Sequence, residues 1–197
     1  MEDVPSDPES FFVRYLPEAL RASPELSVGI TSSGSVTCRV LGSGEWSLRL
    51  NDGVLEVASA EADDVVLQIT VPAEDFEVLV IEPTRILARG PSRPIPHGGG
   101  ALAALAMSVE TARLVRRVPG SVLFVAQDGE VRHRLLVTPG RRSADVDSAE
   151  CTIECALADV IAMRERGSSP MQLFANGKLR LKGNIQIAMA LASIFTK

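Results

Sequence analysis

The chain has 197 residues, 46% of them hydrophobic and 23% charged, a composition typical of a globular protein rather than a disordered or fibrous one. Its net charge of −5 and its aromatic share of only 4% argue against a nucleic-acid partner, which requires basic surfaces and stacking side chains. No apolar run reaches the roughly 20 residues of a transmembrane helix, and MEDVPSDPES lacks the features of an export signal, so we expect a cytoplasmic location.

The first half of the chain predicts one helix followed by strands. Glu9 to Arg21 has a hydrophobic face, and Pro17 is expected to kink or break this helix. From Ser27 the hydrophobic period changes to two, which predicts strands. The alternating residues are Val28 and Ile30; Val36, Cys38 and Val40; Trp46, Leu48 and Leu50; Val54 to Val57, after the tight-turn signal Asn51-Asp52-Gly53; and Val65 to Val71, before Pro72.

The second half follows the same order of elements. Val122 to Ala126 and Val131 to Val137 predict a hairpin around Asp128-Gly129. Cys151 to Leu157 alternates like Leu67 to Ala73, and a short strand is expected in KLRLKG, residues 178–183. Each half then ends in an alanine-rich apolar helix, ALAALAM at 101–107 and IQIAMALASIF at 185–195.

Matched positions at a nearly constant offset predict an internal duplication. Asp75 and Asp159 are 84 residues apart, both at the start of a predicted helix, and PTRILARG (83–90) precedes PMQLFANG (170–177) by 87 residues. We therefore predict a helical leader over residues 1–25, a first unit over 26–118 with a degenerate C-terminal part, and a second unit over 119–197. The stretch RGPSRPIPHGGG (89–100) is too rich in Pro and Gly to form the regular strand that NGKLRLKG forms.

The second half carries a family resemblance in CTIECALADVIAMRERG, SSPMQLFANGKLRLKG and NIQIAMALASIF, most specifically at Phe174, Gly177-Lys178-Leu179, Gly183, Ala188-Met189 and Leu191. The first half carries the earlier strand pattern in GEWSLRLNDGVLEV and ADDVVLQITVPAEDFEVLV. These segments resemble the sterol carrier protein type 2 family. The resemblance implies an α+β fold with a five-stranded, largely antiparallel sheet covered by helices. It also implies a hydrophobic tunnel between the sheet and the C-terminal helices that accepts sterols, fatty acyl chains or other lipids.

The last helix is apolar on all sides, because only Gln186 and Ser193 are polar between Ile185 and Phe195. Such a helix must be covered on more than one side, by the sheet and by a ligand, the other half or another subunit. Ordinary core and ligand lining are both open for its side chains and for those just before it. The candidate lipid-binding residues are Met171, Leu173, Phe174, Leu179, Leu181, Ile185, Met189 and Phe195.

The sequence offers few candidate residues for catalysis or metal binding. His97 and His133 have no nucleophile or carboxylate at a motif spacing, and both are expected to be structural or exposed. Cys151 and Cys155 share one face of a strand about 13 Å apart, too far for one metal ion, and are expected to be small buried hydrophobic residues. Gly98-Gly99-Gly100 lacks the rest of a phosphate loop. Arg113, Arg116 and Arg117 are expected to form a solvated helix end.

The sequence therefore predicts a protein that binds or carries a hydrophobic ligand, such as a sterol, a fatty acyl chain, an isoprenoid or another lipid. No catalytic residue, metal or cofactor is expected, and the chain is not predicted to be an enzyme. The alternatives are a protein-interaction or scaffold module, and an accessory factor to lipid-modifying enzymes. In these the apolar helices would be buried in a domain interface, a homodimer or a contact with an enzyme partner.

Overall fold

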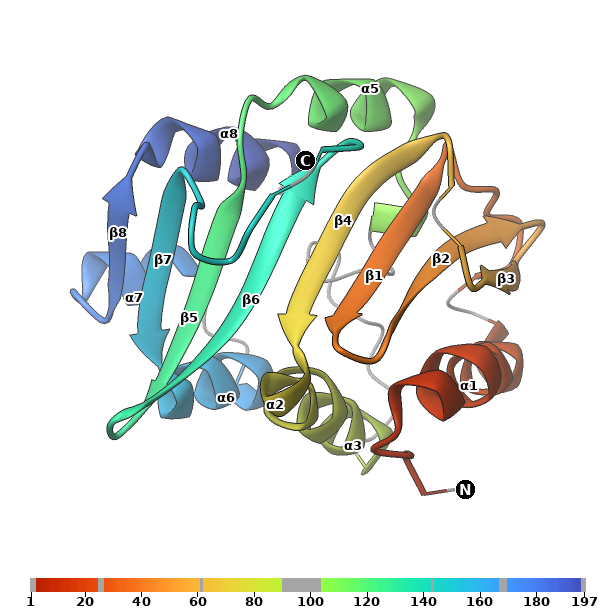
Figure 1. Cartoon of the computed structure of the whole chain (residues 1–197), viewed down its shortest axis with the longest axis horizontal. Helices are drawn as coiled ribbons and strands as arrows, with labels where there is room; N and C mark the ends of the chain where they lie inside the picture. The colour runs from red at the N-terminus through yellow and green to blue at the C-terminus, as the bar shows by residue number, and fades with distance from the viewer. Residues whose placement is uncertain are drawn as a thin grey trace.

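The computed structural model describes residues 3–24, 27–60, 62–89, 104–142, 144–166 and 170–195. The strands of this part form one mixed sheet of eight strands in the order β3-β2-β1-β4-β6-β5-β7-β8 (Figure 1). The predicted α+β class is confirmed, but one sheet runs through both halves of the chain. The strands are β1 Ser35–Leu41, β2 Gly44–Asn51, β3 Val54–Ala58, β4 Val65–Pro72, β5 Val122–Asp128, β6 Val131–Pro139, β7 Cys151–Ala156 and β8 Leu179–Gly183.

The helices gather around the two ends of the strands and behind the sheet. In Figure 1, α5 and α8 run along the upper end, α2 and α3 lie below β4, and α6 and α7 lie behind β5 to β8. Two π-helical stretches, Ser10–Tyr15 and Glu77–Ile81, lead into α1 and α3. The α-helices are α1 Leu16–Ala22, α2 Ala73–Phe76, α3 Glu82–Arg89, α5 Val109–Arg117, α6 Leu157–Arg166, α7 Pro170–Ala175 and α8 Ile185–Phe195. None of the helices in the described ranges is long and apolar enough to cross a membrane.

Two sequence expectations at the beginning of the chain are wrong. Pro17 does not break the first helix, because the π-helical stretch Ser10–Tyr15 continues directly into α1, which has Pro17 in its first turn. A kink at Pro17 stays a prediction. Val28 and Ile30 do not form a strand: residues 27–29 form a turn, and Gly29 adopts a left-handed φ of 72°. The side chain of Val28 is 73% exposed as a result.

The turn between β2 and β3 forms as its sequence predicts. Asp52 and Gly53 both adopt positive φ, 46° and 80°, which is the conformation that a tight hairpin turn needs and that Asp-Gly tolerates well. Residues Asn51 and Val54 are therefore paired directly on either side of the turn.

The strand pairing repeats between the two halves. β1 pairs antiparallel with β2 and parallel with β4, and β5 pairs in the same way with β6 and β7. β8 then pairs antiparallel with β7, whereas the corresponding neighbour of β4 is β6 from the second half. This pattern agrees with the predicted duplication, which stays a prediction. RGPSRPIPHGGG, with His97 and Gly98–Gly100, lies outside the described residues after Arg89.

The main core lies between the first half of the sheet and its helices. Phe12 stacks on Trp46 with ring centroids 4.9 Å apart, and Phe76 packs against Phe12 and Phe11. Alternation along the paired strands places one set of side chains on this helix-covered face and the other set on the outer face. The helix-covered set in the first half comprises Val36, Cys38, Val40, Trp46, Leu48, Leu50, Leu67, Ile69 and Val71.

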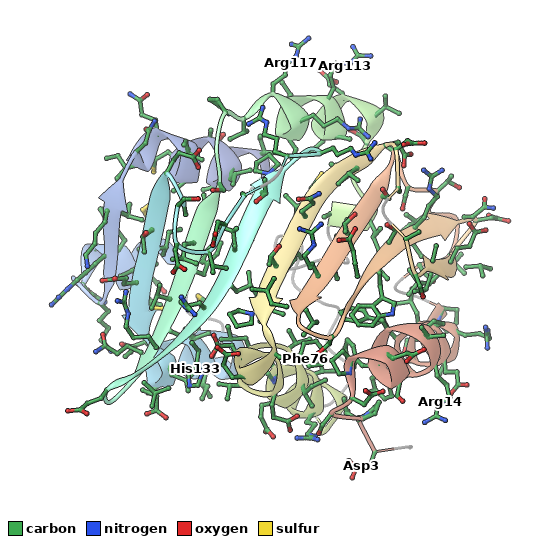
Figure 2. The ribbon with its side chains drawn as sticks, viewed as in Figure 1. Asp3, Arg14, Phe76, Arg113, Arg117 and His133 are labelled. Atoms are coloured by element: carbon green, nitrogen blue, oxygen red, sulfur yellow. The ribbon has the colours of Figure 1, made fainter. Side chains whose placement is uncertain are left out.

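The two halves are joined by β4 and β6 and by a buried contact between Asp75 and His133. Four residue pairs, from Leu67 with Pro139 to Thr70 with Leu136, align these strands. At the end of β4, the Asp75 carboxylate lies 2.9 Å from Nδ1 of His133 and accepts the backbone N–H of Arg134 at 2.9 Å. Figure 2 shows His133 beside the start of α2, close to Phe76. His133 is therefore structural, as the sequence suggested.

Arg116 also joins distant segments of the chain. Its guanidinium donates to the backbone carbonyls of Ser33, Asp64 and Val65 at 3.3, 2.8 and 3.1 Å. Gly34 lies against the same guanidinium, and a Cβ atom at this position would collide with it. Arg116 thus holds the end of α5 on the start of β1 and β4.

The prediction of a solvated arginine cluster is therefore wrong for Arg116. Arg113 and Arg117 are exposed and point away from the molecule above α5, as Figure 2 shows. Their spacing on α5 explains the difference, because only Arg116 lies on the side that faces the sheet.

We expect the substitution Arg116→Met to lower the free energy of unfolding by about 2 to 3 kcal/mol, because three carbonyls lose a charged donor. Arg113→Met is the matched control on the same helix and should change stability by less than about 0.5 kcal/mol. Urea unfolding of the two variants measures the difference. If both variants lost the same free energy of unfolding, Arg116 would not join the segments.

We also expect Asp75→Ala to destabilise the protein by about 2 to 3 kcal/mol, because it leaves His133 and the N–H of Arg134 buried without their acceptor. The control is Asp159→Ala at the corresponding position of the second half. Asp159 pairs with Lys178 at 2.7 Å, but the lysine side chain is 53% exposed. Asp159→Ala should therefore lower the free energy of unfolding by only about 0 to 1 kcal/mol. Thermal unfolding curves of both variants would reveal the predicted order, and the reverse order would refute it.

Candidate functional site

A row of four apolar side chains crosses the second half of the sheet on its helix-covered face. Phe124 of β5 pairs with Leu135 of β6 on one side and with Ile153 of β7 on the other, and Ile153 pairs with Leu181 of β8. Because directly paired residues point to the same face, the four side chains are neighbours. With a strand spacing of about 4.8 Å, this apolar row is about 14 Å long.

The apolar row is only partly covered. Phe124 is 40% exposed, although β5 lies between two other strands near the middle of this half of the sheet. Leu135, Ile153 and Leu181 are half-buried. A large apolar side chain on a central strand normally belongs to the core, so the exposure of Phe124 shows that the described helices do not cover this part of the sheet.

Next to the apolar row, α8 closes the sheet completely. Ile187 and Leu191 of α8 pack on Val122 and Cys151, whose exposed fractions are 1% and 0%. Gly120, at φ 131°, leaves room for the side chain of Ile187. α8 therefore forms a solid wall along one side of the apolar row.

On the other side of the apolar row the sheet carries Ala126, Cys155 and Leu179, and α6 packs on β5 and β7. Burial raises the pKa of the Cys155 thiol, and the negative charge of Asp159 raises it further. Burial likewise raises the pKa of Cys151, and that of Cys38 to about 12. The thiols beside the apolar row are therefore protonated, apolar neighbours rather than nucleophiles.

A small hollow of about 300 Å³ lies between α6 and α7, beyond Leu179. The ion pair between Asp159 and Lys178 lies at its rim, and Leu173 forms part of its lining. The other lining residues are Ala162, Met163, Gln172 and Asn176.

The structure brings together only some of the predicted lipid-binding residues. Leu181 belongs to the apolar row, Leu179 is its half-buried neighbour on β8, and Leu173 of α7 is buried. Met171, Phe174, Ile185 and Met189 are 64%, 50%, 48% and 54% exposed, and the side chain of Phe195 lies outside the described part. The lipid-binding role of the eight residues stays a prediction.

Exposure on α8 differs from the sequence expectation. The sheet covers the side with Ile187, Ala188 and Leu191, and α5 of the first half also contacts α8. Ile185 and Met189 leave the opposite side open. This apolar helix is therefore covered by the sheet and in part by α5, while Ile185 and Met189 stay exposed.

Sequence reasoning did not single out Phe124, Leu135 and Ile153. Alternation placed Phe124 and Ile153 on strands, but it could not show that these residues are neighbours across β5 and β7. The one available signal was the rarity of aromatic residues in the second half, where Phe124 is the only one on a predicted strand.

The site offers little to a metal ion or to catalysis. No group of three His, Cys, Asp or Glu side chains with metal-binding geometry occurs among the residues that the structure describes. Two polar pairs flank the apolar row: Asp159 lies 2.7 Å from Lys178, and His133, on the same face of β6 as Leu135, lies 2.9 Å from Asp75. The arrangement can therefore shield an apolar surface from water.

The second half of the chain matches known proteins. The model of the SCP-2 sterol transfer family matches residues 101–196. Sterol carrier protein 2 of Rattus norvegicus is 33% identical over 92 residues, which are 43% of this chain and only 17% of the relative. This chain thus corresponds to a small part of the length of that relative.

Solved structures of sterol carrier proteins resemble parts of the chain. The apo form of sterol carrier protein 2 from Yarrowia lipolytica is 17% identical, and the match covers 44% of this chain and 74% of that chain with a TM-score of 0.33. Sterol carrier protein 2 like 2 from Aedes aegypti is 15% identical over 61% of this chain and 95% of that chain, also with a TM-score of 0.33. Residues 101–196 of the chain thus match the SCP-2 sterol transfer family, as the sequence resemblance predicted.

Proposed function

We propose that the chain binds a hydrophobic ligand of the lipid class at the apolar row formed by Phe124, Leu135, Ile153 and Leu181. The observation that carries this proposal is the 40% exposure of Phe124 on a central strand. The name of the sterol carrier relatives supports a lipid as the ligand class.

The free energy for binding would come from removing apolar surface from water, at about 25 cal/mol per Å². All four side chains of the apolar row are uncharged, and Cys155 beside them is protonated. A site of this kind favours an aliphatic chain or ring system and makes few demands on the ligand's polar groups.

In this proposal α8 is the wall of the site rather than its roof. Ile187 and Leu191 hold α8 on Val122 and Cys151, so the ligand lies beside α8, between it and α6. Of the residues predicted from sequence, Leu181 and Leu179 would touch such a ligand directly. A longer ligand would continue past Leu179 to the hollow at Leu173.

The first unit would have a structural role. Five of the eight aromatic residues pack together where the helical leader covers this unit: Phe11, Phe12 and Tyr15 of the leader, and Trp46 and Phe76 of the unit. They fill the space between the sheet and helices that the second half leaves partly open. We propose that units 26–118 and 119–197 derive from one duplicated domain, and that only the second binds a ligand.

We expect Phe124→Ser to weaken binding of cis-parinaric acid, a fluorescent fatty acid, by about five- to tenfold. The exposed 40% of this side chain represents about 1 kcal/mol of burial by the ligand. The matched control is Leu114→Ser, whose side chain is 46% exposed on α5, away from the apolar row. Fluorescence titration of both folded variants measures the effect, with circular dichroism to verify the fold.

Two results would contradict this function. The first is wild-type protein that takes up neither parinaric acid nor a sterol probe and carries no lipid in native mass spectrometry after gentle purification. The second is an equal loss of binding in the Phe124 and Leu114 variants, which would place the ligand elsewhere.

A second candidate function, contact with another copy of this chain, is favoured by the open side of α8. Ile185 and Met189 lie one turn apart there and are about half exposed. Two copies packed through this side would bury both residues, and such a contact would be symmetric.

This alternative predicts a dimer that Met189→Lys converts to a monomer in sedimentation velocity experiments, while Val54→Lys does not. Val54 is a suitable control because it is 57% exposed at the other edge of the sheet. A wild-type protein that sediments as a monomer at all concentrations would eliminate the alternative.

A further inference from the structure

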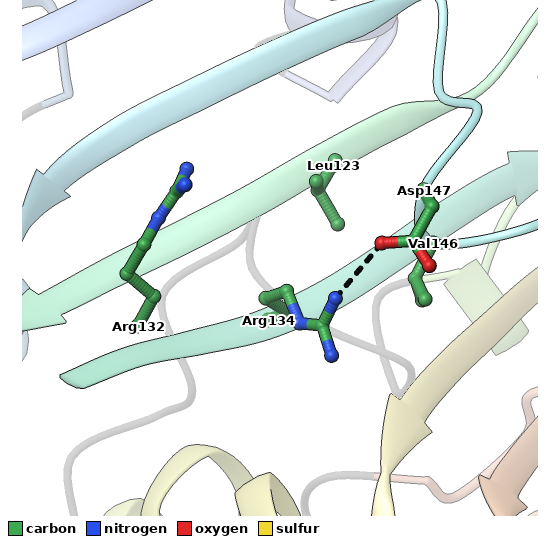
Figure 3. Close-up of a pocket in the computed structure, with 5 residues that line it drawn as sticks. All are labelled: Leu123, Arg132, Arg134, Val146 and Asp147. Atoms are coloured by element: carbon green, nitrogen blue, oxygen red, sulfur yellow. Dashed lines mark hydrogen bonds and ion pairs between the residues drawn. The ribbon is translucent and has the colours of Figure 1, made fainter.

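The outer face of the second half carries a hollow that the lipid-binding proposal does not use. It has a volume of about 360 Å³ and is lined by Leu123 of β5, Arg132 and Arg134 of β6, and Val146 and Asp147 of the following loop (Figure 3). Because Leu123 and Phe124 are consecutive on β5, the hollow and the apolar row lie on opposite faces of the sheet. A ligand in one therefore does not touch a ligand in the other.

The floor of the hollow is apolar and fixed. Leu123 and Val146 are 9% and 7% exposed, and they pack with Val125 and Leu136 in a small core of the outer face. A volume of this size is at the lower end of the range for small-molecule sites, which combine an apolar lining with a few polar groups.

The two arginines lie side by side above this floor. Figure 3 shows Arg134 directed at Asp147, to which it donates at 3.0 Å, with Arg132 next to it on the same strand. The carboxylate of Asp147 is 78% exposed, so its pairing with Arg134 contributes little and can be exchanged for another anion. A planar guanidinium binds carboxylate or phosphate oxygens through two parallel N–H groups.

The electrostatic field around the hollow is positive. Arg132 and Lys182 both bind Glu154, at 2.8 and 2.7 Å, and Arg180 is paired with it across β7 and β8. The hydrogen bond from Lys182, with the charges of Lys182, Arg132 and Arg180, lowers the pKa of Glu154. On this face, four basic side chains, those of Arg132, Arg134, Arg180 and Lys182, surround two carboxylates, those of Glu154 and Asp147. The chain as a whole has a net charge of −5.

The outer face of the first half provides a contrast. There Arg39 pairs with Glu45 at 2.6 Å and Arg49 pairs with Asp64, so each cation has its own carboxylate. The excess of positive charge is therefore specific to the second half, where the hollow lies.

We propose that the hollow between Arg132, Arg134 and the loop at Val146–Asp147 binds an amphipathic anion, with a phosphate or carboxylate on Arg134 and Arg132 and an apolar portion on Leu123 and Val146. The anion replaces Asp147 as the ion-pair partner of Arg134. Glu154 keeps Arg132 oriented over β5. The site is independent of the apolar row and would bind its ligand whether or not that row holds a lipid.

Monomeric octyl phosphate is a suitable probe, with inorganic phosphate and octanol as comparison ligands in calorimetric titration. We expect octyl phosphate to bind more tightly than either comparison ligand, and its affinity to fall as salt is added. Arg134→Gln should weaken its binding about tenfold through the loss of a charge-assisted pair. Arg39→Gln, the control on the outer face of the first half, should have no effect.

Phe124→Ser separates this site from the lipid site. If octyl phosphate bound at the apolar row, its affinity would fall in Phe124→Ser and not in Arg134→Gln, and the proposal would be overturned. Equal binding of octanol and octyl phosphate, or of inorganic and octyl phosphate, would overturn it as well, because one half of the ligand would then be unused. A sterol probe carries no anionic group and tests the apolar row alone, so its failure to bind would leave this result unchanged.

Vesicles that contain phosphatidic acid identify the source of the anion. If flotation with these vesicles decreases in Arg134→Gln, the site recognises the headgroup of a bilayer lipid. If the protein binds monomeric octyl phosphate but does not float with the vesicles, the site takes a free amphiphile. Absence of binding to both would overturn the proposal.

Discussion

The antiparallel pairing of β4 with β6 is the constraint on which the rest of the structure depends. It places a strand of the second half where the first half would otherwise end, so two four-stranded groups become one sheet. Asp75 reinforces the junction by accepting from His133 and from the N–H of Arg134. Because these acceptors and donors are buried, separating the halves would expose an edge on each and leave several polar groups without partners.

The helix-covered face of the continuous sheet is packed differently in its first and second halves. In the first half, five aromatic side chains fill the space under the helices, and the residues beneath them are buried. In the second half, α8 closes one end of the strands, and Phe124 stays partly exposed between α8 and α6. The proposed lipid site is thus the place where the aromatic filling of the first half has no counterpart.

The outer face differs between the halves in charge rather than in volume. One-to-one ion pairs neutralise the first half, whereas Arg132, Arg134, Arg180 and Lys182 share two carboxylates in the second. The sheet keeps these cations away from the apolar row on its other side. The second half therefore presents an apolar surface to the helices and a positive surface to solvent, and the two proposed ligands differ accordingly.

The sequence by itself determined the local elements of this protein. Period-two alternation located the strands, Asn51-Asp52-Gly53 located a hairpin, and the segments around Phe174 and Gly183 indicated the family. These signals are local, because they depend on backbone preferences and on which side of one element a residue faces. Only the tertiary structure decided that β6 lies beside β4. It also decided that Arg116 binds three carbonyls while Arg113 is free in solvent. Finally, it left Phe124 exposed and buried Val122 two residues before it. Those outcomes depend on contacts between residues far apart in sequence, and period-two alternation is the same for a strand whichever strands become its neighbours.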